Sequence, residues 1–74
     1  KMNDEVNTVY TLDDNRNYVL VDSIFYENSN YIYLVEINNP INYMFAIKNG
    51  NELDKVTDAV KISELINEFN KKDN

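Results

Sequence analysis

The segment YIYLVEI, at residues 31–37, carries apolar side chains on both of the faces that a β-strand would present. Successive side chains of a strand point to opposite faces of its sheet. The odd positions of this segment are all uncharged, and the even positions are apolar until Glu36. The segment YMFAIK, at residues 43–48, repeats the pattern, with Lys48 ending its even face. The pattern therefore predicts two strands with apolar side chains on both sides.

Short polar segments separate the apolar runs. Runs rich in β-branched and aromatic residues favour strands. Segments 13–16 and 27–30 are rich in Asp and Asn, which tolerate left-handed backbone conformations, and Asn49-Gly50 favours a tight hairpin. Pro40 makes segment 38–42 a loop, because proline has no N–H to donate. Turns this short force antiparallel neighbours. The expected strands, of which the last is the weakest, are 6–12, 17–26, 31–37, 43–48 and 51–56.

The hydrophobic period changes to that of a helix after residue 56. Thr57 or Asp58 suits the N-cap, and Lys71 and Lys72 suit the C-terminal end of a helix dipole. We therefore expect a helix near 58–70 and an α+β fold, in which an antiparallel four- to five-stranded β-meander carries one C-terminal amphipathic helix on one face. The helix positions at i, i+3, i+4 and i+7 are Ile62, Leu65, Ile66 and Phe69.

The loop at 38–42 sets an expected register between the third and fourth strands. It places Ile37 opposite Tyr43 and Val35 opposite Phe45. In this register Glu36 and Lys48 share one face, so the other face is expected to take the helix. The expected helix-side core is Tyr33, Val35, Ile37, Phe45 and Ile47 beneath Ile62, Leu65, Ile66 and Phe69.

An apolar strip remains on the face away from the helix. Its members, named here the outer strip, are Ile32, Leu34, Met44 and Ala46. Two interpretations stay open. Sheet twist, N-terminal residues or long side chains such as Lys48 cover the strip, or it is exposed and meets a partner. The second interpretation makes the outer strip a candidate interface, for a homodimer or another protein partner.

The chain length and the net charge exclude several classes of function. A chain of 74 residues forms one domain, and its net charge of −6 arises from 13 acidic and 7 basic residues. That balance argues against binding to nucleic acid or to anionic lipid. With no Cys and no His there is neither a disulfide nor a usual zinc site. Domains of this size usually need such a support or self-association.

Catalytic and cofactor chemistry is not indicated. Acyl transfer needs a nucleophile beside a base, and Gly50 alone cannot build a phosphate-binding loop. Asp13, Asn15 and Asn17 match the first three ligand positions of a calcium loop. The match then fails, because Tyr18 replaces the required Gly and Ile24 the bidentate Glu. A plain β-turn explains the segment, so we expect no catalytic, cofactor-binding or metal site.

The order of motifs resembles that of the YrzB-like family, small acidic Firmicute proteins of unknown function. The resemblance rests on Val21-Asp22-Ser23-Ile24, Tyr26, a four-residue turn and the segment 31–34. The acidic, aliphatic helix at 58–69 also fits, and the similarity extends from about residue 8 to residue 69. The chain departs from the family where Asn15 or Arg16 replaces a Gly, and in its neutral loop at 38–40, as a divergent member would. The resemblance implies no enzyme activity and no cofactor.

These observations predict a small non-enzymatic acidic protein that acts through protein–protein contact, as an adaptor or regulator. The alternative is an acidic inhibitor or DNA mimic of phage origin that blocks a nucleic-acid-binding enzyme. The polar start KMNDEVN shows no signal peptide, so the cytoplasm is the default location. We expect a disordered or tag-derived extension at 1–5, a single domain at 6–70 and a polar tail at 71–74.

A calcium titration tests the turn interpretation of Asp13, Asn15 and Asn17. A ligand that binds only the folded state raises the melting temperature. We therefore expect no change in melting temperature on addition of calcium, measured by circular dichroism. A rise at sub-millimolar calcium would mean that the segment holds the ion.

Overall fold

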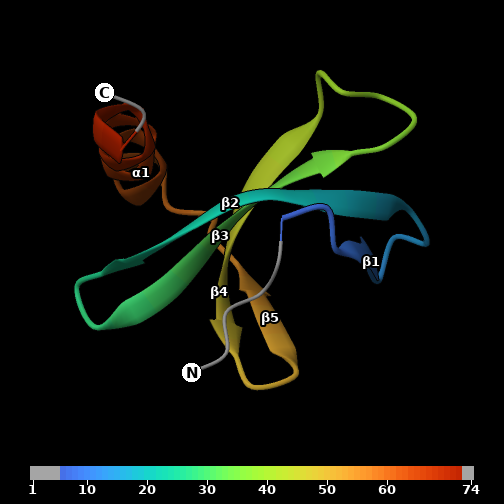
Figure 1. The fold of residues 1–74 in the computed structure, drawn as a ribbon, viewed down its shortest axis with the longest axis horizontal. Coiled ribbons are helices and arrows are strands. Elements are labelled where there is room, and N and C mark those ends of the chain that lie inside the picture. Colours follow the sequence, from blue (N-terminus) through green and yellow to red (C-terminus); the bar gives the residue numbers. More distant parts are fainter. Residues whose placement is uncertain (1–5, 73–74) are drawn as a thin grey trace.

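The protein folds into one antiparallel sheet with a helix on one side, and the computed structural model describes residues 6–72. Each strand lies beside its neighbours in sequence, in the order β1-β2-β3-β4-β5 (Figure 1). This architecture confirms the predicted α+β meander. The extension expected at 1–5 lies outside the described residues. The elements are β1 (Val9–Thr11), β2 (Asn17–Tyr26), β3 (Ser29–Glu36), β4 (Tyr43–Asn49), β5 (Glu52–Lys55) and α1 (Ala59–Lys72).

Residues with a left-handed backbone conformation (positive φ) account for where several strands begin and end. Asn7 has a φ of 78°, and β1 begins after it rather than at residue 6. Glu27 and Asn28 have φ values of 50° and 64°, so two residues suffice for the β2–β3 turn. β3 therefore begins earlier than expected. The β4–β5 turn falls at Gly50 and Asn51, one residue later than expected, and Gly50 takes the positive φ of 58°.

The register between β3 and β4 differs from the prediction by two residues. Tyr33 pairs with Phe45 and Val35 pairs with Tyr43. Sequence had placed Val35 opposite Phe45, which is wrong because β3 ends at Glu36 and the connecting loop is longer than expected. Side chains alternate with a period of two, so a shift of two residues leaves every side chain on its expected face.

A β-bulge at Val21 divides β2 into two parts. The pairing with β3 shifts between Leu20 and Asp22, which leaves Val21 as the extra residue. An extra residue reverses the alternation of side chains and increases the local twist. Leu20 therefore points away from the helix, whereas Ile24, also at an even position, packs on the helix side. One strand thus contributes to the packing on both faces of the sheet.

The core on the helix side is centred on stacked aromatic rings. The rings of Phe45 and Phe69 are 5.4 Å apart and nearly parallel, and Tyr33 lies 5.9 Å from Phe69. Asp58 caps α1, since its carboxylate accepts the backbone N–H of Lys61 at 3.0 Å. The buried members of this helix-side core are Tyr31, Phe45, Val56, Leu65 and Phe69, with Ile24, Tyr26, Tyr33, Ile47 and Ile62 packed around them.

Most of the predicted helix-side packing is confirmed, with three exceptions. Ile37 and Ile66 were expected in this core but are 46% and 38% exposed. Ile37 lies beyond the end of β3, and α1 covers the other end of that strand, around Tyr31. Val35, which was also expected there, is half-buried and lies outside the cluster. The helix therefore covers only part of its face of the sheet.

A second core fills the face away from the helix, and this corrects the prediction for the outer strip. Ile32 and Leu34 are 0% exposed and Ala46 is 1% exposed, so the strip is not open to solvent. Figure 1 shows β1 and the β4–β5 hairpin on the side of β2 opposite α1. Twist thus covers the strip, which is the first of the two interpretations above. This outer core consists of Tyr18, Leu20, Ile32, Leu34 and Ala46, with Tyr10, Leu12, Met44 and Leu53 packed against it.

Truncation of Phe69 tests the docking of α1. Phe69→Ala is expected to cost about 3–5 kcal/mol of unfolding free energy, the usual range for loss of a buried Phe. Ile66→Ala, on the same helix but partly exposed, is the control and should cost much less. Urea unfolding followed by circular dichroism measures both. Equal effects of the two substitutions would contradict the packing of Phe69 on Phe45.

Candidate functional site

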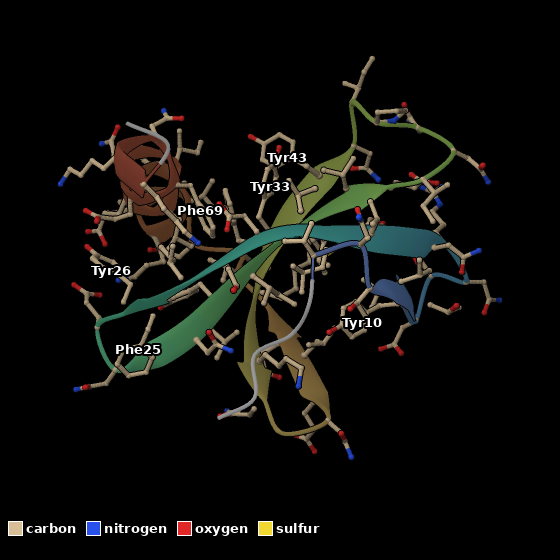
Figure 2. All side chains as sticks on the ribbon, in the orientation of Figure 1. Tyr10, Phe25, Tyr26, Tyr33, Tyr43 and Phe69 are labelled. Carbon is tan, nitrogen blue, oxygen red and sulfur yellow. The ribbon has the colours of Figure 1, made fainter. Side chains whose placement is uncertain are left out.

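A cleft of about 450 Å³ opens between the two edge strands of the sheet. Its floor is formed by Leu34, Met44 and Ala46. Figure 2 shows Tyr10 on the side of β2 away from Phe69, where this cleft lies. Volumes of this size are typical of pockets that bind ligands or partner side chains. The remaining lining residues are Tyr10, Thr11, Leu12, Asp13 and Asp14 on the β1 side, and Asn51, Leu53 and Lys55 on the β5 side.

The curl of the sheet produces the cleft. β1 and β5 are the two ends of the strand order, and within residues 6–72 each pairs with one strand only. Both turn toward the outer core, because Tyr10 and Leu53 pack against it. The outer edge of each strand therefore presents backbone N–H and C=O groups that no strand of the described part of the chain pairs with. Such edges are the usual places where an additional strand pairs.

The lining of the cleft is apolar at its floor and polar at its rim. Its floor is apolar, and its hydroxyl-bearing side chains are those of Tyr10 and Thr11. Within residues 6–72 no group of three or more His, Cys, Asp or Glu side chains comes together to hold a metal ion. Acidic Asp13 and Asp14 lie at the β1 side of the rim, and Lys55 lies at the β5 side. The arrangement offers an apolar surface bordered by charges of both signs.

Asp14 joins the rim of the cleft to the outer core. Its carboxylate accepts the hydroxyl of buried Tyr18 at 2.8 Å and the backbone N–H of Arg16 at 2.9 Å. The hydrogen bond from the Arg16 backbone, followed by that from Tyr18, holds the pKa of Asp14 below its usual value of 3.8. The same bond to Asp14, together with burial, raises the pKa of the Tyr18 hydroxyl above 10.0. The turn between β1 and β2 is thereby tied to the core.

Glu36 closes the polar end of the outer core. It is buried, and its carboxylate accepts the side-chain amide of Asn42 at 3.0 Å. The guanidinium of Arg16 lies 3.6 Å from the same oxygen. Asn42 also donates to the Tyr18 hydroxyl at 3.5 Å, so these groups form one network. These partners satisfy the Glu36 carboxylate where it is buried beside the apolar side chains.

The cleft contains three of the four residues of the outer strip. Leu34, Met44 and Ala46 line it, whereas Ile32 is buried elsewhere in the outer core. Sequence did not identify the walls formed by Tyr10, Leu12 and Leu53. A signal was present in the apolar alternation of Tyr10 and Leu12 in the first expected strand. The candidate interface is therefore a cleft floor, not an exposed strip.

Comparison of the chain with protein-family models, with curated proteins and with solved structures gives no match. The resemblance to the YrzB-like family therefore stays a prediction. None of the helical segments in the described part of the chain is long and apolar enough to cross a membrane.

The hydrogen bonds of Asp14 predict a specific dependence of stability on pH. A carboxylate with a depressed pKa stabilises the fold above its unfolded pKa, near 3.8, and this contribution is lost as the pH falls through the folded pKa. Asp14→Asn should therefore melt below the parent at neutral pH, and the difference should shrink as the pH falls below about 4. Thermal denaturation across this range measures it.

Asp13→Asn is the matched control for this prediction. It removes the adjacent charge but leaves the bonds from Tyr18 and Arg16 to Asp14 in place. A pH-dependent difference of the same size in both variants would show that general charge repulsion, not the Asp14 hydrogen bonds, sets the acid stability.

Proposed function

We propose that this protein is a small non-enzymatic adaptor or regulator that holds an extended segment of a protein partner in the cleft between β1 and β5. One observation carries the proposal: an apolar floor of Leu34, Met44 and Ala46 lies between two strands, each of which pairs on one side only within residues 6–72. Addition of a strand to an exposed edge is a common way in which proteins bind extended peptides.

The strand edges and the apolar floor of the cleft would contact different parts of such a segment. The edge of β5 or β1 would pair with its main chain, which supplies affinity without reading its sequence. Alternate side chains of an extended segment point to the same side, so every second residue would face the floor. Apolar side chains at those positions suit half-buried Met44, whereas Leu34 and Ala46 are 0% and 1% exposed and support the floor without reaching its surface.

The rim favours one direction for the bound segment. Asp13 and Asp14 border the cleft on one side and Lys55 on the other. A segment with a basic residue near the β1–β2 turn and an acidic residue near Lys55 would match these charges. Charges at the border of an interface contribute mainly to specificity and association rate. The apolar floor should therefore dominate the affinity.

The pattern of ion pairs supports contact of this kind over DNA mimicry. A mimic needs rows of unneutralised carboxylates to occupy a basic groove. Here Lys61 pairs with both Glu27 and Glu64, and the hydrogen bonds that it donates to these carboxylates raise the pKa of Lys61. Three further carboxylates are also paired: Glu68 with Lys71, Asp22 with Lys72, and Glu36 with Arg16.

Affinity capture from cells of the source organism tests the proposal, with parent protein and two lysine variants immobilised. Met44→Lys places a charge on the cleft floor, whereas Val60→Lys places the same charge on the exposed surface of α1. We expect a protein that the parent and Val60→Lys retain at low and high salt and that Met44→Lys binds about tenfold less, as is common for a central contact.

Two results would contradict the cleft as the binding site. Capture by Met44→Lys equal to that of the parent would place the contact elsewhere. Capture that disappears at high salt would indicate the electrostatic inhibitor instead, because such binding weakens steeply with salt. Lys55→Glu, an exposed change at the rim, provides a second variant if Met44→Lys does not fold.

A further inference from the structure

Four side chains form a continuous line across the sheet on the helix side. Val9 pairs with Val19, Val19 with Val35, and Val35 with Tyr43. Directly paired residues of antiparallel strands point to the same face. Their neighbours Tyr10 and Tyr18, which pair with each other, belong to the outer side. The line, named here the open row, is Val9, Val19, Val35 and Tyr43.

The helix leaves the open row uncovered. None of its four residues belongs to the helix-side core, although they share its face. Val9 is 53% exposed and Tyr43 is 45% exposed, while Val19 and Val35 are half-buried. The ring of Tyr33 lies 5.9 Å from that of Tyr43 in an edge-to-face arrangement, and Figure 2 shows both on the helix side of the sheet.

The surroundings of the open row carry no unpaired charge. The residues two positions along each strand share its face, except where the bulge intervenes in β2. None of the members of this set is charged, although charged residues make up 27% of the chain: Thr11, Asn17, Tyr33, Ile37 and Phe45. Ile37 is itself partly exposed and extends the apolar surface at the end of β3. Asp22, which pairs with Tyr33 just after the bulge, also lies on this face, but Lys72 neutralises it at 2.6 Å. The patch is thus largely apolar and carries no net charge in an acidic protein.

We propose that the open row is the contact surface of a homodimer, with a second copy of this chain as its occupant. Each copy carries a net charge of −6, so most pairs of surfaces would bring acidic groups together. A neutral face is where two copies can meet without that repulsion, and it offers no electrostatic attraction to a basic partner. Self-association also supplies the support that a domain this small, with no Cys and no His, cannot obtain from a disulfide or zinc.

The position of α1 restricts how two copies meet. Facing sheets pack about 10 Å apart, which is also roughly the thickness of a helix. The helix of the second copy must therefore lie past the end of the first copy's sheet, at the end opposite the first copy's own helix. A two-fold axis along the open row satisfies this and brings each row residue near its own copy. The cleft lies on the opposite face and stays open, so the dimer is independent of the proposed function.

Sedimentation equilibrium tests the dimer. We expect the parent to have twice its monomer mass of 8.7 kDa, with little dependence on salt. Val9→Lys and Tyr43→Lys should be monomers, because each places a charge within the contact at a partly exposed position. Val60→Lys, on α1, and Met44→Lys, in the cleft, should remain dimers. A monomeric parent, or dissociation by Val60→Lys as complete as by Tyr43→Lys, would overturn the proposal.

Disulfide cross-linking tests the symmetry, since the chain contains no other Cys. Val19→Cys and Val35→Cys should each form a covalent dimer on mild oxidation, because the two-fold axis brings each residue near its own copy. Val60→Cys is the matched control, a valine on α1 that is 66% exposed, and it should stay monomeric. Equal cross-linking of all three variants would show random collision and reject the open row as the interface.

Discussion

The β-bulge at Val21 is the constraint on which the rest of the structure depends. Without it, Leu20 and Ile24 would point to the same face of β2, and one core would lose an aliphatic contribution from this strand. With it, the first part of β2 packs under β1 and the second part packs under α1. The added twist also lets β1 and β5 turn over the outer core instead of extending a flat sheet. A chain of this length can then bury apolar side chains on both faces of a single sheet.

The sequence predicted the strands and the helix of this fold better than it predicted how they pack against one another. Alternation in residues 31–37 and 43–48 assigned the right faces even though the register was wrong, because a shift of two residues preserves them. The cleft could not be predicted in the same way. Whether Leu34 is buried depends on Tyr10 and Leu53, which reach it only through the curl of the sheet. The incomplete reach of α1 likewise depends on where the helix lies, which the spacing of Ile62 and Phe69 does not specify.

Apolar surface and charged groups are distributed differently on the two faces of the sheet. On the outer side, the carboxylate of Asp14 accepts a hydrogen bond from buried Tyr18 and also borders the cleft. The polar rim of the cleft is therefore hydrogen-bonded to the outer core beneath it. On the helix side, the ion pairs involve α1 and the β2–β3 hairpin, through Lys61 with Glu27 and Lys72 with Asp22. The neutral surface outside these ion pairs runs across the sheet from β1 to β4.

The sequential order of the strands has a consequence for how the chain folds. Every strand pairs with the one made just before it, so β1 to β5 can assemble through successive hairpins without closing a long loop. Folds dominated by such local contacts reach their native state faster than those that depend on distant pairings. The helix, however, is synthesised after all five strands. Until Leu65 and Phe69 emerge, the aromatic face of β3 and β4 has no cover, and during translation this nascent surface is the most exposed to aggregation.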